Sequence, residues 1–175
     1  EIQWCVIPNS LSNVREFLSD WEINGIILTG GEDLGQNLIR DSLELEIISI
    51  AMSQRMPVLG VCRGAHVIAR NFEAKLAKVE GHVAIEHFVK LELDASRFSD
   101  EDKIFVNSYH TQAICADEFP ETLQVLGRDS SGHVEFFKVH DKPIWSIMWH
   151  PERTGSNSQE NLSKNLMRLV FLSGS

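Results

Sequence analysis

The sequence predicts a doubly wound, flavodoxin-like α/β fold, a mostly parallel sheet with helices on both faces and a few antiparallel edge strands. Three observations support this class. Apolar strands alternate with helices in the first half of the chain, which implies parallel strands joined by right-handed crossovers. The run at residues 144–149 is apolar on both faces, as in a strand that is covered on both sides. Glycine-rich or polar segments follow three of the strands, at the sheet edge where such folds bind ligands.

The first half of the chain is expected to hold three strand–helix pairs. Ser12 can cap the first helix, and the apolar residues of the second recur at helical spacing. The expected strands are residues 4–8, 25–29 and 58–61, and the expected helices are residues 14–21, 38–55 and 64–72.

The second half is expected to contain shorter strands before the buried one at residues 144–149. Asp-Ser-Ser-Gly at residues 129–132 is typical of a hairpin turn, and the polar residues 94–102 of an exposed loop. The shorter strands are expected at residues 75–79, 83–93, 103–106, 123–128 and 133–139, with a closing amphipathic helix at 157–172. Without repeats or a linker, we expect residues 1–175 to form a single domain.

A Gly60-x-Cys62-x-Gly64 pentapeptide joins the strand at 58–61 to the following helix. This is the cysteine form of the nucleophile elbow, a tight turn that exposes a reactive side chain above the sheet. A helix N-terminus favours thiolate over thiol. A buried structural cysteine is the alternative for Cys62, and taken alone it is the more common case.

Two further segments follow buried strands. His150-Pro151-Glu152 ends the strand at 144–149, and Glu152 is close enough in sequence to orient the His150 imidazole, as the carboxylate of a catalytic triad does. Gly30-Gly31 follows the strand at 25–29, and such a loop can direct backbone N–H groups at an oxyanion. Each segment alone also fits an ordinary surface turn.

Taken in order, Gly-Gly, Gly-x-Cys-x-Gly and His-Pro-Glu make the chain resemble the class I glutamine amidotransferase family. Val61-Cys62-Arg63-Gly64 and Val106-Asn107-Ser108-Tyr109-His110 most resemble its γ-glutamyl-γ-aminobutyrate hydrolase branch. The resemblance implies that Cys62 is the nucleophile, His150 the base and Glu152 its partner. It also implies an oxyanion hole formed by the backbone N–H groups of Gly31 and Arg63, and a glutamyl pocket lined by Tyr109, His110 and Thr111.

Two features depart from that family. His66 stands where the elbow commonly continues to a glutamine that contacts substrate. An imidazole can become cationic, so we expect a substrate with an anionic leaving group to be favoured over free glutamine. The family also opens with a strand and helix before the segment that matches residues 4–8, so the chain is expected to lack them as a fragment of a longer protein.

The amino-acid composition limits the kinds of molecule that this protein is expected to bind. Sixteen basic and twenty-five acidic residues give a net charge of −9, which argues against nucleic acid or an anionic membrane. Three cysteines without metal-type spacing favour a reducing compartment, so we expect a cytoplasmic protein. No apolar run is long enough to span a bilayer. His82, Glu86 and His87 match no zinc-binding spacing, and we expect neither a metal nor an organic cofactor.

These observations favour cysteine-dependent hydrolysis of a small-molecule γ-glutamyl amide through a γ-glutamyl thioester. Two other functions remain open. The chain could be a glutaminase module that delivers ammonia to a synthetase partner, for which an exposed apolar docking face would be evidence. It could also be a non-catalytic binding or stress protein on the same fold. A homodimer is also possible, and the leaving group is undetermined.

Overall fold

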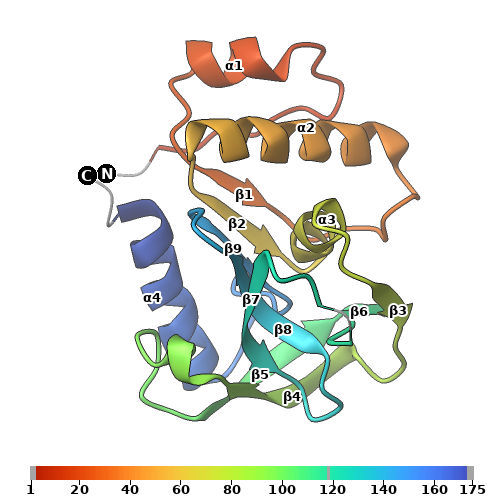
Figure 1. The fold of residues 1–175 in the computed structure, drawn as a ribbon, viewed down its shortest axis with the longest axis vertical. Coiled ribbons are helices and arrows are strands. Elements are labelled where there is room, and N and C mark those ends of the chain that lie inside the picture. The colour runs from red at the N-terminus through yellow and green to blue at the C-terminus, as the bar shows by residue number, and fades with distance from the viewer. Residues whose placement is uncertain (1–2, 118, 173–175) are drawn as a thin grey trace.

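A computed structural model describes residues 3–117 and 119–172, and it has an α/β architecture (Figure 1). The described helices are α1 (Val14–Asp20), α2 (Leu38–Gln54), α3 (Arg63–Asn71) and α4 (Asn157–Leu172), with a 3₁₀ turn η1 (Leu93–Ala95). The described strands are β1 (Ile26–Leu28), β2 (Val58–Val61), β3 (Leu76–Lys78), β4 (Val83–Leu91), β5 (Lys103–Tyr109), β6 (Gln112–Ile114), β7 (Leu123–Arg128), β8 (Val134–Val139) and β9 (Ile144–Ile147).

The described strands form one sheet in the order β1-β2-β9-β8-β7-β4-β5, and β6 pairs with both β3 and β8. β1, β2 and β9 are parallel neighbours, and the other described pairings are antiparallel. The predicted α/β class is confirmed, but the antiparallel part is more extensive than a few edge strands. Short connections explain this, because a turn such as residues 129–132 can join only antiparallel strands.

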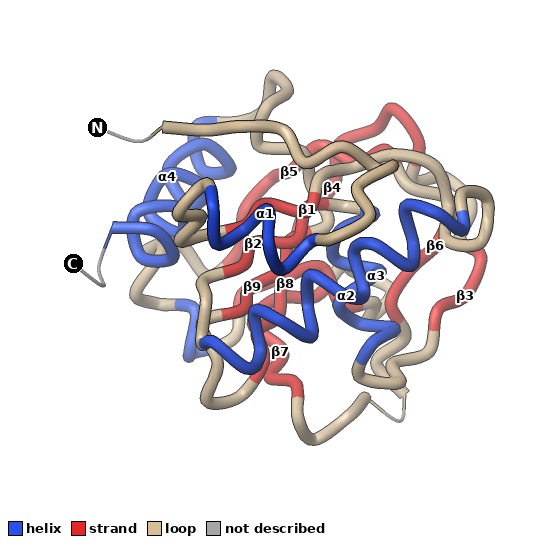
Figure 2. The backbone as a smooth tube through the Cα atoms, turned by 90° about the horizontal axis from the view of Figure 1, so that it is seen from above, coloured by secondary structure: helices blue, strands red, loops and turns tan. Residues whose placement is uncertain are grey.

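Helices cover both faces of the sheet, as the apolar run at residues 144–149 predicts. Ile144 packs in a core with α1, α2 and α3, whereas Trp145 and Ile147 pack in a second core with α4. This alternation follows from the period of two in a strand. Figure 2 shows α1 and α2 lying over the strands.

The three parallel strands bring their C-terminal ends to one edge of the sheet. Leu28 of β1 is level with Gly60 of β2, which is level with Ser146 of β9. Because all three strands run in the same direction, the residues that follow them emerge side by side. The loop after β1, the turn after β2 and the segment after β9 therefore lie next to one another.

The structure differs from the sequence-based predictions at three points. The N-cap of α1 is Asn13 rather than Ser12, because the Asn13 side-chain oxygen accepts from the Glu16 N–H at 3.2 Å. Residues 4–8 form no strand, and Trp4 and Val6 are exposed. β6 was not predicted, because a three-residue strand between polar segments carries no clear periodicity. Among the described residues, none of the helices is long and apolar enough to cross a membrane.

Candidate active site

Cys62 occupies a strained turn between β2 and α3. It is the N-cap residue of α3, with φ of 50° and ψ of −105°, a backbone conformation that non-glycine residues rarely adopt. Its N–H donates to the Ile147 carbonyl of β9 at 2.8 Å. A Cβ on Gly64 would lie 2.1 Å from the Leu28 carbonyl oxygen, so only glycine allows α3 to approach β1 this closely. This backbone has the geometry of a nucleophile elbow.

His150 follows β9 and has the tautomer that a general base requires. Its Nδ1 lies 2.6 Å from Oε1 of Glu152. Because an ionised carboxylate only accepts hydrogen bonds, Nδ1 carries the proton and Nε2 carries the lone pair. Nε2 is buried and has no hydrogen-bond partner among the described residues. It is therefore free to take a proton from a nearby nucleophile.

Asn107 of β5 holds the His150 backbone from both sides. Its side-chain oxygen accepts from the His150 N–H at 2.8 Å, and its amide group donates to the His150 carbonyl at 3.0 Å. Both partners are buried, where hydrogen bonds are costly to lose. Asn107 thus fixes the position from which the imidazole projects, a role that its place in the sequence motif did not reveal.

The Gly30-Gly31 loop packs directly against His150. A Cβ on Gly30 would lie 2.7 Å from His150 Cε1, so the ring occupies space that any other residue would fill. Arg40 of α2 holds the loop by donating to the Thr29 and Gly30 carbonyls, at 3.0 and 3.1 Å. Arg40 is a positioning residue that no sequence motif predicts.

Arg63 presents only its backbone to Cys62. Its N–H hydrogen-bonds to the Cys62 thiol, while its buried side chain forms ion pairs with Asp41 and Glu44 of α2. The guanidinium group therefore anchors α3 to α2. The backbone N–H stays next to the thiol, where an oxyanion donor is needed.

A cavity of about 260 Å³ opens at this edge of the sheet. The ring of Tyr109 lies edge-on to His150, with centroids 5.6 Å apart. Seven of the nine residues predicted for the site line this cavity, whereas His150 and Glu152 are not among its lining residues. The cavity is lined by Gly31, Glu32, Asp33, Gln36, Cys62, Arg63, His66, Tyr109, His110 and Thr111.

Comparison with known proteins identifies the family. Residues 6–152 match the model of Peptidase C26. The chain belongs to the Peptidase C26 family. It is 32% identical over 154 residues to the γ-glutamyl-CDP-amidate hydrolase of Campylobacter jejuni, covering 85% of this chain and 72% of that protein. It is 27% identical over 171 residues to a glutamine-hydrolyzing GMP synthase subunit of Methanococcus aeolicus, covering 97% of this chain and 85% of that protein.

Solved structures agree on the fold. A Thermoplasma acidophilum protein described as a GMP synthase subunit superposes with a TM-score of 0.76 at 20% identity, covering 94% of this chain and 79% of that chain. A glutamine amidotransferase from Thermotoga maritima superposes with a TM-score of 0.66 at 16% identity, covering 91% of this chain and 65% of that chain. This Peptidase C26 member is a glutamine amidotransferase-like hydrolase that acts on C–N bonds.

His66 lines the cavity of the Peptidase C26 chain but is not a cation there. Burial lowers its pKa to about 4, and the neighbouring His110 adds to the decrease. His66 Nε2 and His110 Nδ1 both lie within hydrogen-bond distance of the Gln112 carbonyl oxygen, at 3.2 and 2.7 Å. Because a carbonyl only accepts, both nitrogens carry protons. The predicted cationic role of His66 is therefore wrong at neutral pH.

Cys62 also differs from its sequence-based prediction. Burial raises the pKa of its thiol from 9.0 to about 11, and the Glu135, Glu152 and Asp33 carboxylates add to the increase. The hydrogen bond from the Arg63 N–H lowers the thiol pKa, but its effect is smaller than the increase caused by burial. The expectation that Cys62 is held as a thiolate at the helix N-terminus is therefore wrong, because the effect of the helix is outweighed. The resting side chain is a thiol that needs a base.

Alkylation of Cys62 should reflect this raised pKa. We expect its rate with iodoacetamide to rise about tenfold per pH unit above neutrality and to level off only near the thiol pKa, because the thiolate is the reactive form. Exposed Cys5 should react first at neutral pH. Peptide mass spectrometry over a pH series would measure both rates. A plateau for Cys62 below about pH 8 would contradict the prediction.

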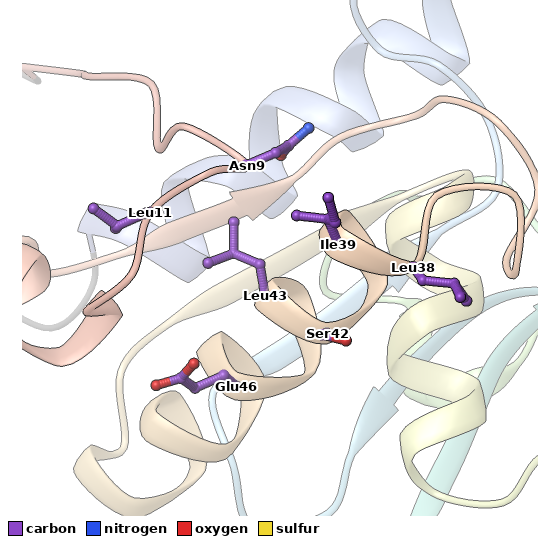
Figure 3. A pocket seen from close by; sticks show the side chains of 7 residues that line it. All are labelled: Asn9, Leu11, Leu38, Ile39, Ser42, Leu43 and Glu46. Atoms are coloured by element: carbon purple, nitrogen blue, oxygen red, sulfur yellow. The ribbon is translucent and has the colours of Figure 1, made fainter.

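A second hollow of about 430 Å³ lies between the N-terminal segment and α2 (Figure 3). None of its lining residues is a cysteine or a histidine. They are Asn9, Leu11, Leu38, Ile39, Ser42, Leu43 and Glu46. The Cys62 cavity is therefore the candidate active site.

Proposed function

We propose that this Peptidase C26 member hydrolyses a γ-glutamyl amide through a γ-glutamyl thioester on Cys62. The observation that carries the proposal is the pairing of two strand ends. Cys62 stands on a strained turn after β2, and His150, whose buried Nε2 has no partner among the described residues, follows the adjacent parallel strand β9. A nucleophile and a base with these roles are what acyl transfer requires.

The proposed reaction begins with proton transfer from the Cys62 thiol to His150 Nε2. The sulfur attacks the γ-carbonyl carbon, and the backbone N–H groups of Arg63 and Gly31 stabilise the oxyanion. Collapse of this intermediate breaks the C–N bond, and the imidazolium protonates the departing amine. His150 then removes a proton from water, which attacks the thioester and releases glutamate. Glu152 orients the ring and stabilises its charged form.

The cavity offers partners for the glutamyl group. Asp33 lines it, and Thr111 Oγ1 donates to Asp33 Oδ2 at 2.9 Å. This bond holds the carboxylate in place, where it can bind the substrate ammonium group. His66, Tyr109, His110 and Thr111 would enclose the remainder of the glutamyl chain.

Arg153 supplies a positive charge near the exit for the leaving group. Its guanidinium lies 4.0 Å from the Tyr109 ring centroid, and Tyr109 in turn packs against His150. An anionic leaving group would be attracted to this side of the site. The name of the Campylobacter jejuni relative, a hydrolase of γ-glutamyl-CDP-amidate, supports a leaving group of this charge.

Substrate preference tests the proposal. We expect kcat/KM for γ-glutamyl-γ-aminobutyrate to exceed that for glutamine by at least about tenfold, a difference of roughly 1.4 kcal/mol. Arg153→Gln should lower kcat/KM for γ-glutamyl-γ-aminobutyrate about fivefold, as expected for an exposed charge pair. It should leave kcat/KM for glutamine unchanged. The matched control is Arg15→Gln, at an exposed position of α1. A wild-type preference for glutamine would overturn the leaving-group assignment.

A glutaminase module is the second candidate. Leu38 and Ile39, at the start of α2, are 70% and 68% exposed and line the hollow of Figure 3. Exposed apolar side chains of this kind favour contact with a partner. The similarity to the Methanococcus aeolicus GMP synthase component supports a synthetase as that partner. In this case glutamine would be the preferred substrate, so the same kinetic comparison separates the two candidates.

A further inference from the structure

Three histidines and a glutamate gather on the antiparallel part of the sheet, next to the candidate active site. His82 precedes β4, His87 lies on β4, His110 follows β5, and Glu135 lies on β8. Each residue offers one ligand atom, and these four atoms all lie within 4.8 Å of one another. The ring centroid of His82 lies 4.9 Å from those of both His87 and His110.

A β-bulge brings His82 and His87 to the same side of the sheet. Their separation of five residues would place them on opposite faces of a regular strand. The pairing of β4 with β5 shifts register between Val83 and Ile85, and Ala84 has a φ of 55°. The extra residue reverses the alternation. Such bulges are typical of functional positions rather than of accidental ones.

The carboxylate of Glu135 has no hydrogen-bond partner among the described residues. It is 1% exposed, and neither oxygen accepts a hydrogen bond. His110 Nε2 lies 3.5 Å from Oε1, and His87 Nε2 lies 3.9 Å from Oε2. His110 Nδ1 already donates to the Gln112 carbonyl, so in the neutral ring Nε2 directs a lone pair at the carboxylate. A buried charge in this setting costs several kcal/mol unless a cation lies between the groups.

The remaining contacts resemble the outer shell of a metal site. Metal-bound histidines usually donate their second ring N–H to a carboxylate or a backbone carbonyl. His82 Nε2 lies 3.5 Å from Asp129 Oδ2, which leaves a buried Nδ1 without a partner among the described residues. His110 uses the Gln112 carbonyl in the same way. Both rings are thus oriented with one nitrogen toward the centre of the cluster.

We propose that His82, His87, His110 and Glu135 bind one Zn²⁺ ion. Imidazole nitrogens suit zinc and other borderline metals rather than Ca²⁺ or Mg²⁺, and three histidines with one carboxylate complete a tetrahedral set. Ligand atoms of such an ion lie about 3.3 Å apart, given bonds of roughly 2.0 Å. Two of the separations are 3.5 and 3.9 Å and all are within 4.8 Å, so side-chain rotations would bring the four atoms to this spacing around the ion. The ion would tie β4, β5 and β8 together beside His110, which lines the active-site cavity.

The proposed ligand set differs from the three residues considered from sequence, His82, Glu86 and His87, whose spacing predicts no metal. The cluster does not contain Glu86, which is exposed, and takes Glu135 and His110 from more distant segments. Spacing along the chain could not reveal this set, because its members lie on or next to three different strands, β4, β5 and β8.

Zinc binding to the whole chain tests the proposal. The Cys62→Ser variant should be used as the parent, so that the Cys62 and His150 pair cannot supply an alternative site. After removal of metal by chelation, the parent should bind one equivalent of Zn²⁺ in competition with a chromophoric chelator. Co²⁺ should give the strong visible absorption of a four-coordinate ion, without a thiolate charge-transfer band.

Two pairs of variants locate the ion. His87→Gln and Glu135→Gln, each in the Cys62→Ser parent, should weaken zinc binding at least about tenfold and abolish the zinc-dependent rise in melting temperature. His140→Gln and Glu86→Gln make the same chemical changes at exposed positions. These two variants should keep the zinc affinity of the parent and its zinc-dependent rise in melting temperature. Circular dichroism checks folding, and partly buried His87 provides the test if Glu135→Gln does not fold. Absence of zinc binding by the parent, or equal affinity in all four variants, would overturn the proposal.

Discussion

Replacing Cys62 with serine is expected to reduce turnover of a γ-glutamyl amide by at least about 10³-fold. The hydroxyl of serine is a far weaker nucleophile than the thiolate that a base generates from cysteine. The substitution changes one atom in a side chain that is 4% exposed, so the fold should persist. Release of glutamate, measured together with the melting temperature, would separate lost chemistry from lost structure.

The other two cysteines provide matched controls for this substitution. Cys5 is exposed and Cys115 is half-buried, and neither lines the cavity. Cys5→Ser and Cys115→Ser should retain the wild-type rate. Equal losses in all three variants would mean that Cys62 has no special role, and a non-catalytic binding function would then be favoured.

Local patterns were sufficient to predict the parallel strands β1, β2 and β9 and the segments that follow them, although they also predicted a strand at residues 4–8 that the structure does not contain. The run at residues 144–149 is apolar on both faces because α3 and α4 cover opposite sides of β9. The glycines around Cys62 mark a close approach, since Gly64 meets the Leu28 carbonyl. Signals of this kind depend only on residues that are adjacent in the sequence. Parallel strands then bring their C-terminal ends to the same edge of the sheet.

Long-range contacts were not predictable in the same way. Asn107 fixes His150 from a strand 43 residues away in sequence, and Arg40 holds the glycine loop from α2. Neither residue type is unusual at its position, so no local pattern distinguishes them. The β-bulge at Ala84 was likewise not predictable from sequence. The one-residue shift in register depends on how β4 pairs with β5.

The balance of charge effects at Cys62 also depends on tertiary structure. The dipole at the start of α3 favours a thiolate, and this much is evident from the motif. Burial and the Glu135, Glu152 and Asp33 carboxylates act in the opposite direction, and these come from separate segments. A raised thiol pKa makes His150 necessary at neutral pH, because too little thiolate exists without a base.

This dependence on a base predicts unequal effects at His150 and Glu152. His150→Ala should lower kcat/KM by about 10³-fold or more, because it removes the lone pair that accepts the thiol proton. Glu152→Gln should lower it only about 10- to 100-fold. The glutamine oxygen can still accept a hydrogen bond from the Nδ1–H group at the position of Oε1. The Glu152 side chain is 59% exposed, so solvent screening moderates the loss of charge.

Steady-state kinetics of both variants over a pH series would measure this difference. Glu160→Gln, at another exposed carboxylate in the first turn of α4, is the matched control and should match wild type. If Glu152→Gln also matches wild type, Glu152 does not orient His150 during catalysis. The backbone contacts of Asn107 with His150 would then have to hold the imidazole in position without help from a carboxylate.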